Sequence, residues 1–130
     1  VLLQNVPNMA WIFGYTNAPW TLKADIAARY VCRLINHLQA TGMQVVTPRD
    51  HQGCAIADMS VMGALESGYV QRANAILPRQ GRSLPWRLLN AYEQDRVMLL
   101  DEVLEDDNLE FLPRNSESGN KTAGSNSRAA

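Results

Sequence analysis

MAWIFGYTNAPWTLK, residues 9–23, is the stretch that decides the fold of this chain of 130 residues. Its first five residues form an apolar run, which predicts a strand over residues 9–13 that is buried on both faces. Glycine, asparagine and proline then punctuate the chain before a helical pattern starts. We therefore expect a strand, a tight loop and a helix that is capped by Asn17 or Thr21.

The predicted helix spans residues 20–41. Apolar side chains repeat at four-residue steps along one stripe: Leu22, Ile26, Tyr30, Leu34 and Leu38. Further small or apolar side chains widen this stripe: Ala24, Ala27, Ala28, Val31 and Ile35. Because so wide an apolar surface favours burial on most sides, we expect a largely buried helix with Lys23, Arg29 and Arg33 on a narrow exposed strip. Gly42 follows as the residue that ends it.

Two shorter elements are predicted after this helix. Residues 43–47 have strand character, whereas residues 48–66 show no clean period, so we expect a strand followed by a loop. A short helix is predicted over residues 69–77, with Ser67 as its cap and Pro78 at its end.

The C-terminal part predicts a third helix, a strand and a tail. Pro85 is a favourable first-turn residue and starts a helical pattern that runs to residue 104. The apolar residues expected to face inward are Trp86, Leu89, Val97, Leu100 and Leu104. Residues 109–112 form a terminal strand pattern. Residues 113–130 are rich in Ser, Asn and Gly and carry almost no apolar area, so we expect a disordered tail.

The charge balance excludes some classes of partner. Twelve basic and 13 acidic residues leave a net charge of −1, so nothing favours a general attraction to nucleic acid or to an anionic membrane. The charges are uneven, with a basic middle and an acidic run: Arg72, Arg79, Arg82, Arg87 and Arg96, then Asp101, Glu102, Glu105, Asp106, Asp107 and Glu110. Both groups are interpreted as solvated surface.

The sequence also bears on location. It has no apolar stretch near the roughly 18 residues that span a bilayer and no signal-peptide pattern. We expect an intracellular protein without a transmembrane segment, located in the cytoplasm or at the periphery of the membrane.

The cysteines and histidines do not predict a metal centre. Cys32 and Cys54 lie 22 residues apart, without a C-x-x-C pair, and His37 and His51 lie 14 apart. A structural zinc site needs four closely grouped ligands. We expect no metal site and two buried free thiols.

No catalytic motif stands out. The eight glycines never approach the spacing G-x-G-x-x-G or G-x-x-x-x-G-K, and no G-x-S-x-G sequence is present. Asp25 and Glu66 are lone carboxylates of the kind that usually lies on the surface. We therefore assign no catalytic residue.

The strand, loop and helix over residues 9–41 have one functional geometry. A helix start presents unpaired backbone N–H groups and the positive end of the helix dipole, which suits an anionic or electron-rich group. Trp20 beside this start would line a flat ligand. The alternative is that Trp20 and Tyr15 pack in the core and the loop only turns the chain, and the residues alone leave both open.

Four blocks of sequence resemble one enzyme family. Residues 6–25 read VPNMAWIFGYTNAPWTLKAD, residues 30–37 YVCRLINH, residues 67–72 SGYVQR and residues 84–88 LPWRL. Together they resemble the C-terminal part of class B flavin-dependent monooxygenases, most closely the Baeyer–Villiger-type branch. The resemblance covers residues 1–112.

The resemblance implies an architecture of three parts. It implies the C-terminal piece of an α/β flavoprotein with two dinucleotide-binding domains, a piece that is mostly helical with one or two strands and a disordered tail. Residues 1–47 would supply the final strand and helix of the FAD domain, residues 48–112 a helical extension and residues 113–130 the tail. The strand of the FAD sheet would run over residues 9–14.

The resemblance also implies a reaction and a cofactor site. FAD and NADPH, held largely by regions outside this chain, would insert one oxygen atom from O2 into a small ketone or a soft heteroatom such as sulfur. The start of the helix would face the flavin, with Asn17, Trp20, Thr21 and Leu22 as the FAD-binding set. Because both glycine fingerprints lie outside the chain, we expect this fragment to be inactive alone.

Two other interpretations remain at this point. One is a small helical protein-interaction module without a cofactor. The other is a different FAD- and NAD(P)H-dependent flavoprotein, such as a reductase, which would keep FAD but not oxygenate.

Overall fold

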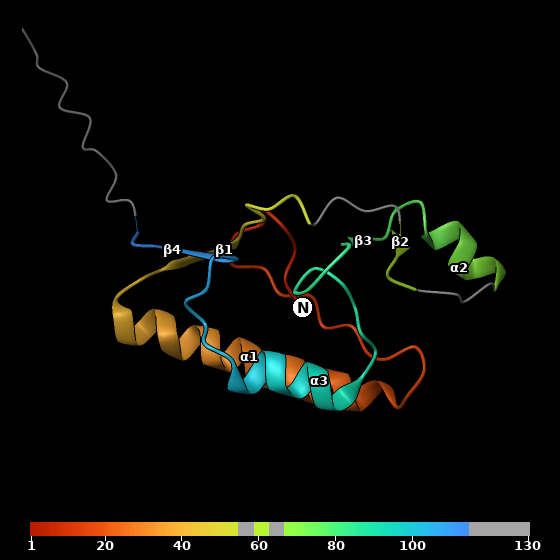
Figure 1. Ribbon diagram of the computed structural model, residues 1–130, viewed down its shortest axis with the longest axis horizontal. Coiled ribbons are helices and arrows are strands. Elements are labelled where there is room, and N and C mark those ends of the chain that lie inside the picture. The colour runs from red at the N-terminus through yellow and green to blue at the C-terminus, as the bar shows by residue number, and fades with distance from the viewer. Residues whose placement is uncertain (55–58, 63–66, 115–130) are drawn as a thin grey trace, which may run out of the picture.

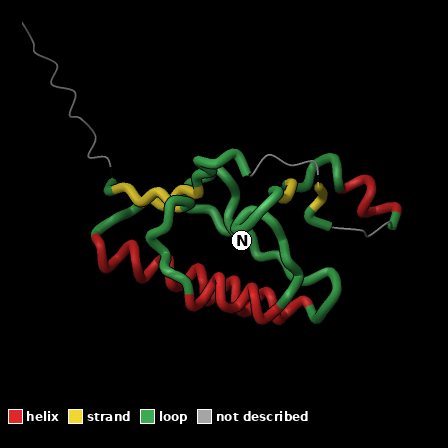
Figure 2. Tube along the Cα trace, in the orientation of Figure 1, coloured by secondary structure: helices red, strands yellow, loops and turns green. Residues whose placement is uncertain are grey.

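The computed structural model describes residues 1–54, 59–62 and 67–114, and these form one long helix with the short strands on one side of it (Figures 1 and 2). The elements follow in chain order: α1 (Trp20–Thr41), β1 (Val45–Pro48), β2 (Met59–Ser60), α2 (Gly68–Ala73), β3 (Arg79–Gln80), α3 (Tyr92–Arg96), the π-helical turn η1 (Val97–Asp101) and β4 (Leu109–Leu112). The expected mixture of helix and strand is confirmed. The described residues hold four short strands, however, where one or two were expected.

Helix α1 has the predicted bounds and the predicted end. Gly42 follows it with φ 71°, a left-handed conformation that glycine adopts at little cost. The predicted caps are wrong, because the capping position is Pro19 and no side chain caps the helix. Thr21 already lies inside the first turn, and the amide of Asn17 donates instead to the carbonyl of Asn90.

The prediction of a largely buried α1 is also wrong. Ile26 and Ala27 are fully buried, but Trp20, Leu22 and Ile35 are exposed, and Cys32, expected to be buried, lies on the same open side. Among the helices and strands, α3, η1 and β1 make most of the contacts with α1, and they leave several of its apolar side chains exposed.

The basic residues of α1 also differ from the predicted exposed strip. Arg29 is exposed as expected, but Lys23 is buried, with 6% of its surface accessible. Arg33 is half-buried, and its guanidinium donates to the carbonyls of Leu99 and Glu102 at the end of η1. It therefore fastens η1 to the middle of α1.

A two-stranded antiparallel sheet joins distant parts of the chain. Strand β1 pairs with β4 in the register Val46 to Phe111, so the predicted strands at 43–47 and 109–112 are confirmed with a shift of the first. The N-terminal segment lies along the other edge of β1, where the backbone N–H of Asn8 donates to the carbonyl of Val46 at 2.9 Å. Arg49, which directly follows β1, forms an ion pair with Glu110 of β4, with 2.9 Å between Arg49 Nη2 and Glu110 Oε2.

The predicted strand over residues 9–13 is wrong. A strand pairs with a neighbouring strand along its length, and the described residues offer this segment one isolated bridge, between Leu2 and Ala10. Met9 and Ile12 are 44% and 39% exposed. The segment is therefore an extended lead into the loop before α1.

The third predicted helix begins seven residues late, at Tyr92. Between Pro85 and that point the backbone is held in turns, since the N–H groups of Trp86 and Arg87 both donate to the carbonyl of Ser83. Asn90 has φ 54°, which a continuous right-handed helix does not allow. Among the residues expected to face inward, Val97 is 42% exposed, and the core position belongs to Leu99 instead.

The region between β1 and α3 forms the far end of the molecule in Figure 1. Strands β2 and β3 pair there, and α2 starts after Ser67 but ends at Ala73, earlier than predicted, and without a bond from the Ser67 side chain. β2 lies within the predicted loop over 48–66. Of the predicted tail, residues 115–130 lie outside the described residues.

Candidate functional site

The four residues expected at the cofactor lie together around the start of α1. The Asn17 amide donates to the carbonyl of Asn90 at 3.1 Å. Trp20 is 50% exposed, and its indole packs against Gly14 and edge-on to Phe13, with ring centroids 5.0 Å apart. Thr21 and Leu22 are exposed. The sequence left two interpretations of Trp20 open, a residue that lines a flat ligand and a residue of the core. The structure is intermediate, because one side of the ring is packed and the other is open.

Of the three candidate residues in the first turn of α1, Trp20 and Thr21 offer backbone donors, whereas Leu22 does not. The Leu22 N–H already donates to the carbonyl of Pro19 at 3.2 Å. The N–H groups of Trp20 and Thr21 follow Pro19, the first acceptor of the helix, too closely to bond its carbonyl, so they have no partner within the helix. The first turn carries no acidic side chain. Within residues 1–54, 59–62 and 67–114, no acceptor is bonded to either N–H group, so an anionic or electron-rich group outside this helix start would find two donors and the positive end of the dipole.

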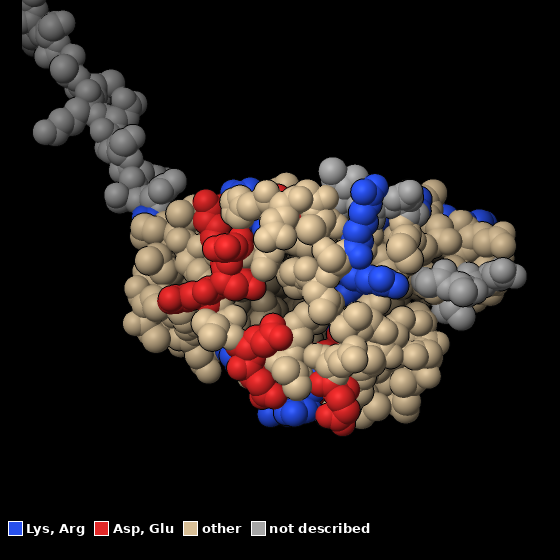
Figure 3. Space-filling model, viewed as in Figure 1, with Lys and Arg blue, Asp and Glu red and all other residues tan. Residues whose placement is uncertain are grey.

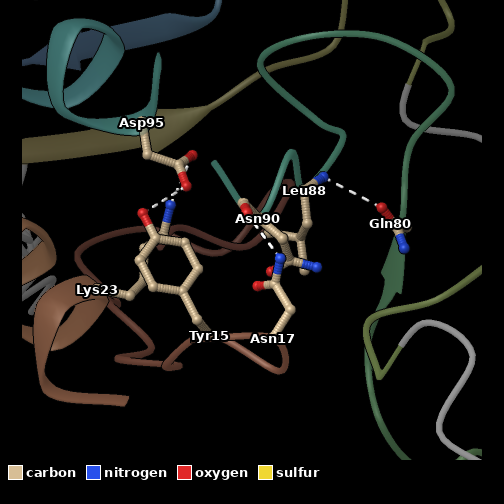
Figure 4. Close-up of polar contacts among 7 residues, drawn as sticks. All are labelled: Tyr15, Asn17, Lys23, Gln80, Leu88, Asn90 and Asp95. Atoms are coloured by element: carbon tan, nitrogen blue, oxygen red, sulfur yellow. Dashed lines mark hydrogen bonds and ion pairs between the residues drawn. The ribbon is translucent and has the colours of Figure 1, made fainter. Parts of the chain in front are cut away.

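A buried polar cluster lies directly behind this helix start (Figure 4). Lys23 Nζ lies 2.7 Å from Asp95 Oδ1, and the Tyr15 hydroxyl donates to Asp95 Oδ2 at 2.8 Å. Tyr15, Lys23 and Asp95 are 4%, 6% and 1% exposed. The cluster thus joins the loop, the first turn of α1 and α3 at one point.

The electrostatics explain why these three groups occur together. A lysine in the first turn of a helix is repelled by the positive end of the dipole, and its burial needs a partner. The Asp95 carboxylate supplies that partner, and the ammonium also lies 5.5 Å from the centre of the Tyr15 ring. Burial first, and then the hydrogen bond to Asp95, holds the pKa of Tyr15 well above its usual range. Tyr15 therefore stays a neutral donor.

Sequence reasoning missed this cluster. Lys23 was expected on the exposed strip, Tyr15 entered only as a residue of loop or core, and Asp95 was not singled out. One local signal was available, because a lysine in the first turn of a helix is placed unfavourably toward the dipole. The identity of its partner is not readable, since Asp95 lies 72 positions further along the chain.

Asn90 forms a second attachment of the loop to the same segment. Its amide donates to the Thr16 hydroxyl at 3.4 Å, and its carbonyl accepts from Asn17. The backbone N–H of Leu88 donates to the side chain of Gln80 at 3.1 Å, which links the segment to β3 (Figure 4). The segment 88–95 is therefore held at one end and holds the loop at the other.

Two small clefts flank this arrangement. The first, of about 110 Å³, is lined by the Lys23–Asp95 pair and by apolar side chains that include Tyr30, Trp86 and Met98. The second, of about 120 Å³, is lined by Trp11, Phe13 and Trp86 beside the buried Gln80. The residues Asn17, Trp20, Thr21 and Leu22 line neither of the two. The clefts and the helix start are thus separate features.

The charged groups are largely solvated, as the sequence predicts. Figure 3 shows acidic side chains gathered over one side of the visible face and basic ones beside them. Arg96 is an exception, because it is half-buried and pairs with Asp101 at 3.1 Å and with Glu93 at 3.6 Å. Glu110, in its pair with Arg49, is another.

The described part of the chain offers neither a metal cluster nor a membrane span. Within residues 1–54, 59–62 and 67–114, no group of three or more His, Cys, Asp or Glu side chains is placed to hold a metal ion. Over the same ranges, no helix is both long enough and apolar enough to cross a membrane. Cys32 and Cys54 are free thiols, Cys32 exposed and Cys54 half-buried.

Comparison with known proteins identifies the relatives of the chain. It is 53% identical over 111 residues to MymA of Mycobacterium tuberculosis, a match that covers 85% of this chain and 22% of MymA. It is 44% identical over 121 residues to AlmA of an Acinetobacter species, covering 93% of this chain and 24% of AlmA. All are named as FAD-containing or FAD-binding monooxygenases. The chain resembles one part of these monooxygenases.

The resemblance extends to EthA and stays partial in length. EthA of Mycolicibacterium smegmatis, named as an FAD-containing monooxygenase, is 40% identical over 111 residues, which are 85% of this chain and 22% of EthA. The chain spans less than a quarter of the length of the relatives it matches. No protein-family model matches it, and no solved structure is significantly similar to it.

Proposed function

We propose that the chain is the C-terminal part of an FAD- and NADPH-dependent monooxygenase of the Baeyer–Villiger type. The observation that carries this proposal is the 53% identity to an FAD-containing monooxygenase over 111 residues, a level and length far above chance likeness of short motifs. Regions outside the chain would hold most of both cofactors in two dinucleotide-binding domains. The substrate would be a small ketone or a sulfur-containing molecule.

The start of α1 has the chemistry that a flavin ring needs on one edge. Two backbone donors, from Trp20 and Thr21, are left free, and no acidic side chain opposes an anion there. The open side of Trp20 supports an aromatic ring beside these donors. This donor set fits the oxygen and nitrogen acceptors at the pyrimidine edge of a flavin.

The bound flavin would supply the redox chemistry, and this chain would position it. The N–H groups of Trp20 and Thr21 would donate to the pyrimidine edge of the ring. The dipole of α1, a helix of 22 residues, would favour the negative charge that this edge gains on reduction. Asn17 and Leu22 would shape the wall of the site beside Trp20. No proton transfer is assigned to this chain.

The proposal is tested on the full-length protein that contains this chain. We expect it to carry FAD in stoichiometric amount and to oxidise NADPH with uptake of O2. We also expect a ketone or an organic sulfide to gain one oxygen atom, seen by mass spectrometry with labelled O2.

Two results would contradict the proposal and separate its alternatives. Bound FAD and NADPH oxidation with no oxygen transferred to any ketone or sulfide would indicate a reductase. A folded protein without flavin would indicate an interaction module. The names of the three relatives favour the monooxygenase over both.

A further inference from the structure

Three consecutive residues of the loop before α1 are each bonded to one short segment of the C-terminal half. Tyr15 donates to Asp95, Thr16 accepts from Asn90, and Asn17 donates to the carbonyl of Asn90. Lys23, one turn into α1, pairs with the same Asp95. Residues 90–95 therefore grip the loop and the first turn together (Figure 4).

We propose that Asp95 and Asn90 are positioning residues, which fix the 15–17 loop and the first turn of α1 and so seat the flavin from outside its own domain. This inference rests on the proposed function. Trp20 and Thr21, the residues with free backbone donors, lie between the gripped loop residues and the gripped Lys23. Their direction is thus set from both sides.

The contacts of Asp95 and Asn90 are better suited to fixing the position of the loop than to adding stability. A buried ion pair adds little net stability over apolar packing of the same volume, because desolvation offsets the attraction. Both oxygens of Asp95 are used, one by Lys23 and one by Tyr15, which fixes the carboxylate in two directions. Asn90 adds a backbone with φ 54°, which asparagine tolerates better than most residues, and its side-chain amide donates to Thr16.

Fixing the position of the loop matters for a cofactor that is held by oriented backbone N–H donors. Donors that are displaced by about 1 Å lose much of their effect on a reacting group. The loop itself has little apolar anchoring beyond Tyr15, since Asn17 and Pro19 are exposed. We therefore expect the loop to loosen when its partners in residues 90–95 are removed.

The experiment compares three variants of the full-length protein with a matched control. Asp95→Asn removes the charge, Tyr15→Phe removes one hydrogen bond and keeps the ion pair, and Asn90→Gly removes the side chain while allowing the backbone conformation. Glu110→Gln is the control, because it breaks an ion pair of similar length between β4 and Arg49. Amide hydrogen exchange, FAD dissociation and the flavin reduction potential are measured for each.

The expected result is a local effect with a flavin signature. Exchange of the amides of residues 15–22 accelerates by roughly tenfold or more in Asp95→Asn, and by less in Tyr15→Phe and Asn90→Gly. FAD also dissociates faster, and the reduction potential of the flavin differs from that of the parent protein. Both changes are largest in Asp95→Asn. Glu110→Gln leaves all three quantities unchanged.

The hydrogen-exchange measurement and the flavin measurements test separate parts of the proposal. Unchanged exchange at residues 15–22 in folded Asp95→Asn and Asn90→Gly would overturn the grip itself. Faster exchange with unchanged FAD dissociation and potential would overturn its role toward the flavin. A parent protein that binds no FAD would defeat the proposed function and with it the flavin part of this inference, whereas the exchange measurement would still decide whether the grip exists. If Asp95→Asn does not fold, Tyr15→Phe and Asn90→Gly decide the same questions.

Discussion

At the scale of single residues, the buried Lys23–Asp95 pair predicts a large effect when one partner is removed. Both groups are more than nine-tenths buried, so replacing Lys23 leaves the Asp95 carboxylate buried and charged, with the Tyr15 hydroxyl as its remaining bonded partner in the described cluster. We expect Lys23→Met to lower the free energy of local opening of α1 by about 3 kcal/mol, a typical cost for breaking a buried pair from one side. Native-state hydrogen exchange of the α1 amides measures this opening.

The double variant separates the pair from ordinary packing. Replacing both partners by apolar residues of similar size is often close to neutral, so Lys23→Met with Asp95→Leu should recover most of the loss, at the cost of the Tyr15 bond. A double variant as unstable as the sum of the two single variants would show that Lys23 and Asp95 act independently.

Tyr30 predicts an alkaline limit to stability. Burial is the main cause that raises the pKa of Tyr30 to about 12 from an ordinary value of 10.0, with the nearby Asp106 adding to it. Because the folded pKa lies above the unfolded one, the contribution of Tyr30 is complete below pH 10.0 and is lost as the pH rises toward about 12.

The Tyr30 prediction is checked with Tyr30→Phe, which has no proton to lose. The loss of stability between these two pH values should be smaller in the variant than in the parent protein, in thermal unfolding followed by circular dichroism. Tyrosinate absorbance should show one group fewer that titrates late. An identical alkaline loss in both proteins would assign it to another group.

Single residues also show where sequence interpretation stops. The local position of Lys23 in a helix was predictable, because α1 has a clear period, but its burial was not. Burial of a lysine depends on a carboxylate that the fold brings from α3, and the spacing between the two carries no pattern. The candidate flavin residues were identified by resemblance, whereas the residues that hold them were visible only in the structure.

At the scale of elements, the donors at the start of α1 predict effects of different size for two variants of one residue. Thr21→Ala keeps the backbone N–H and should be mild. Thr21→Pro removes this N–H, which makes no bond inside the helix. We expect Thr21→Pro in the full-length protein to weaken FAD binding by a free energy on the order of one to a few kcal/mol. We also expect it to lower the reduction potential of the flavin.

The control for this prediction is Leu22→Pro. It removes an N–H that already donates to Pro19 within the first turn, so it perturbs the helix start without removing a free donor. Equal effects of Thr21→Pro and Leu22→Pro would assign the loss to a distorted first turn. If Thr21→Pro folds and keeps both the potential and the FAD content of the parent, the Thr21 N–H does not serve the flavin.

The contact between Gly14 and Trp20 predicts a second effect at this helix start. A methyl group at Gly14 would overlap the Trp20 indole, so Gly14→Ala should move the ring off Phe13 and change its fluorescence. Gly42→Ala is the matched control, since open space surrounds that position and only its positive φ is strained, at about 1 kcal/mol. Unchanged tryptophan emission in Gly14→Ala would contradict the packing.

The elements differ in how far local sequence predicts them. The bounds of α1 and the strand at 109–112 follow from local period and punctuation, and both are confirmed. The strand expected over 9–13 fails because pairing is a property of neighbours, and the described neighbours provide one bridge. The helix expected from Pro85 fails because turn bonds and the left-handed Asn90 compete with a favourable first-turn residue.

At the scale of the whole molecule, two closures between distant segments define the fold. One is the β1–β4 sheet, which joins residues 45–48 to residues 109–112. The other is the attachment of residues 90–95 to the loop before α1. The sheet lies at the C-terminal end of α1 and the attachment of residues 90–95 at its N-terminal end (Figure 1). The C-terminal half therefore acts as a brace for α1. The proposed division at residues 47 and 48 stays a prediction.

The brace and the helix start do not by themselves make a strong FAD site. The pyrophosphate of a dinucleotide normally rests on a glycine-rich loop and the helix that follows it, and none of the eight glycines of this chain has that spacing. What the chain offers is two backbone donors and the half-exposed ring of Trp20. We therefore expect the purified 130-residue chain to lose FAD on desalting, while the full-length protein retains it. The visible absorbance of both samples, after equal incubation with FAD, measures the difference. A stoichiometric yellow complex of the chain alone would mean that it contains a complete flavin site, and that the cofactor does not depend on regions outside it.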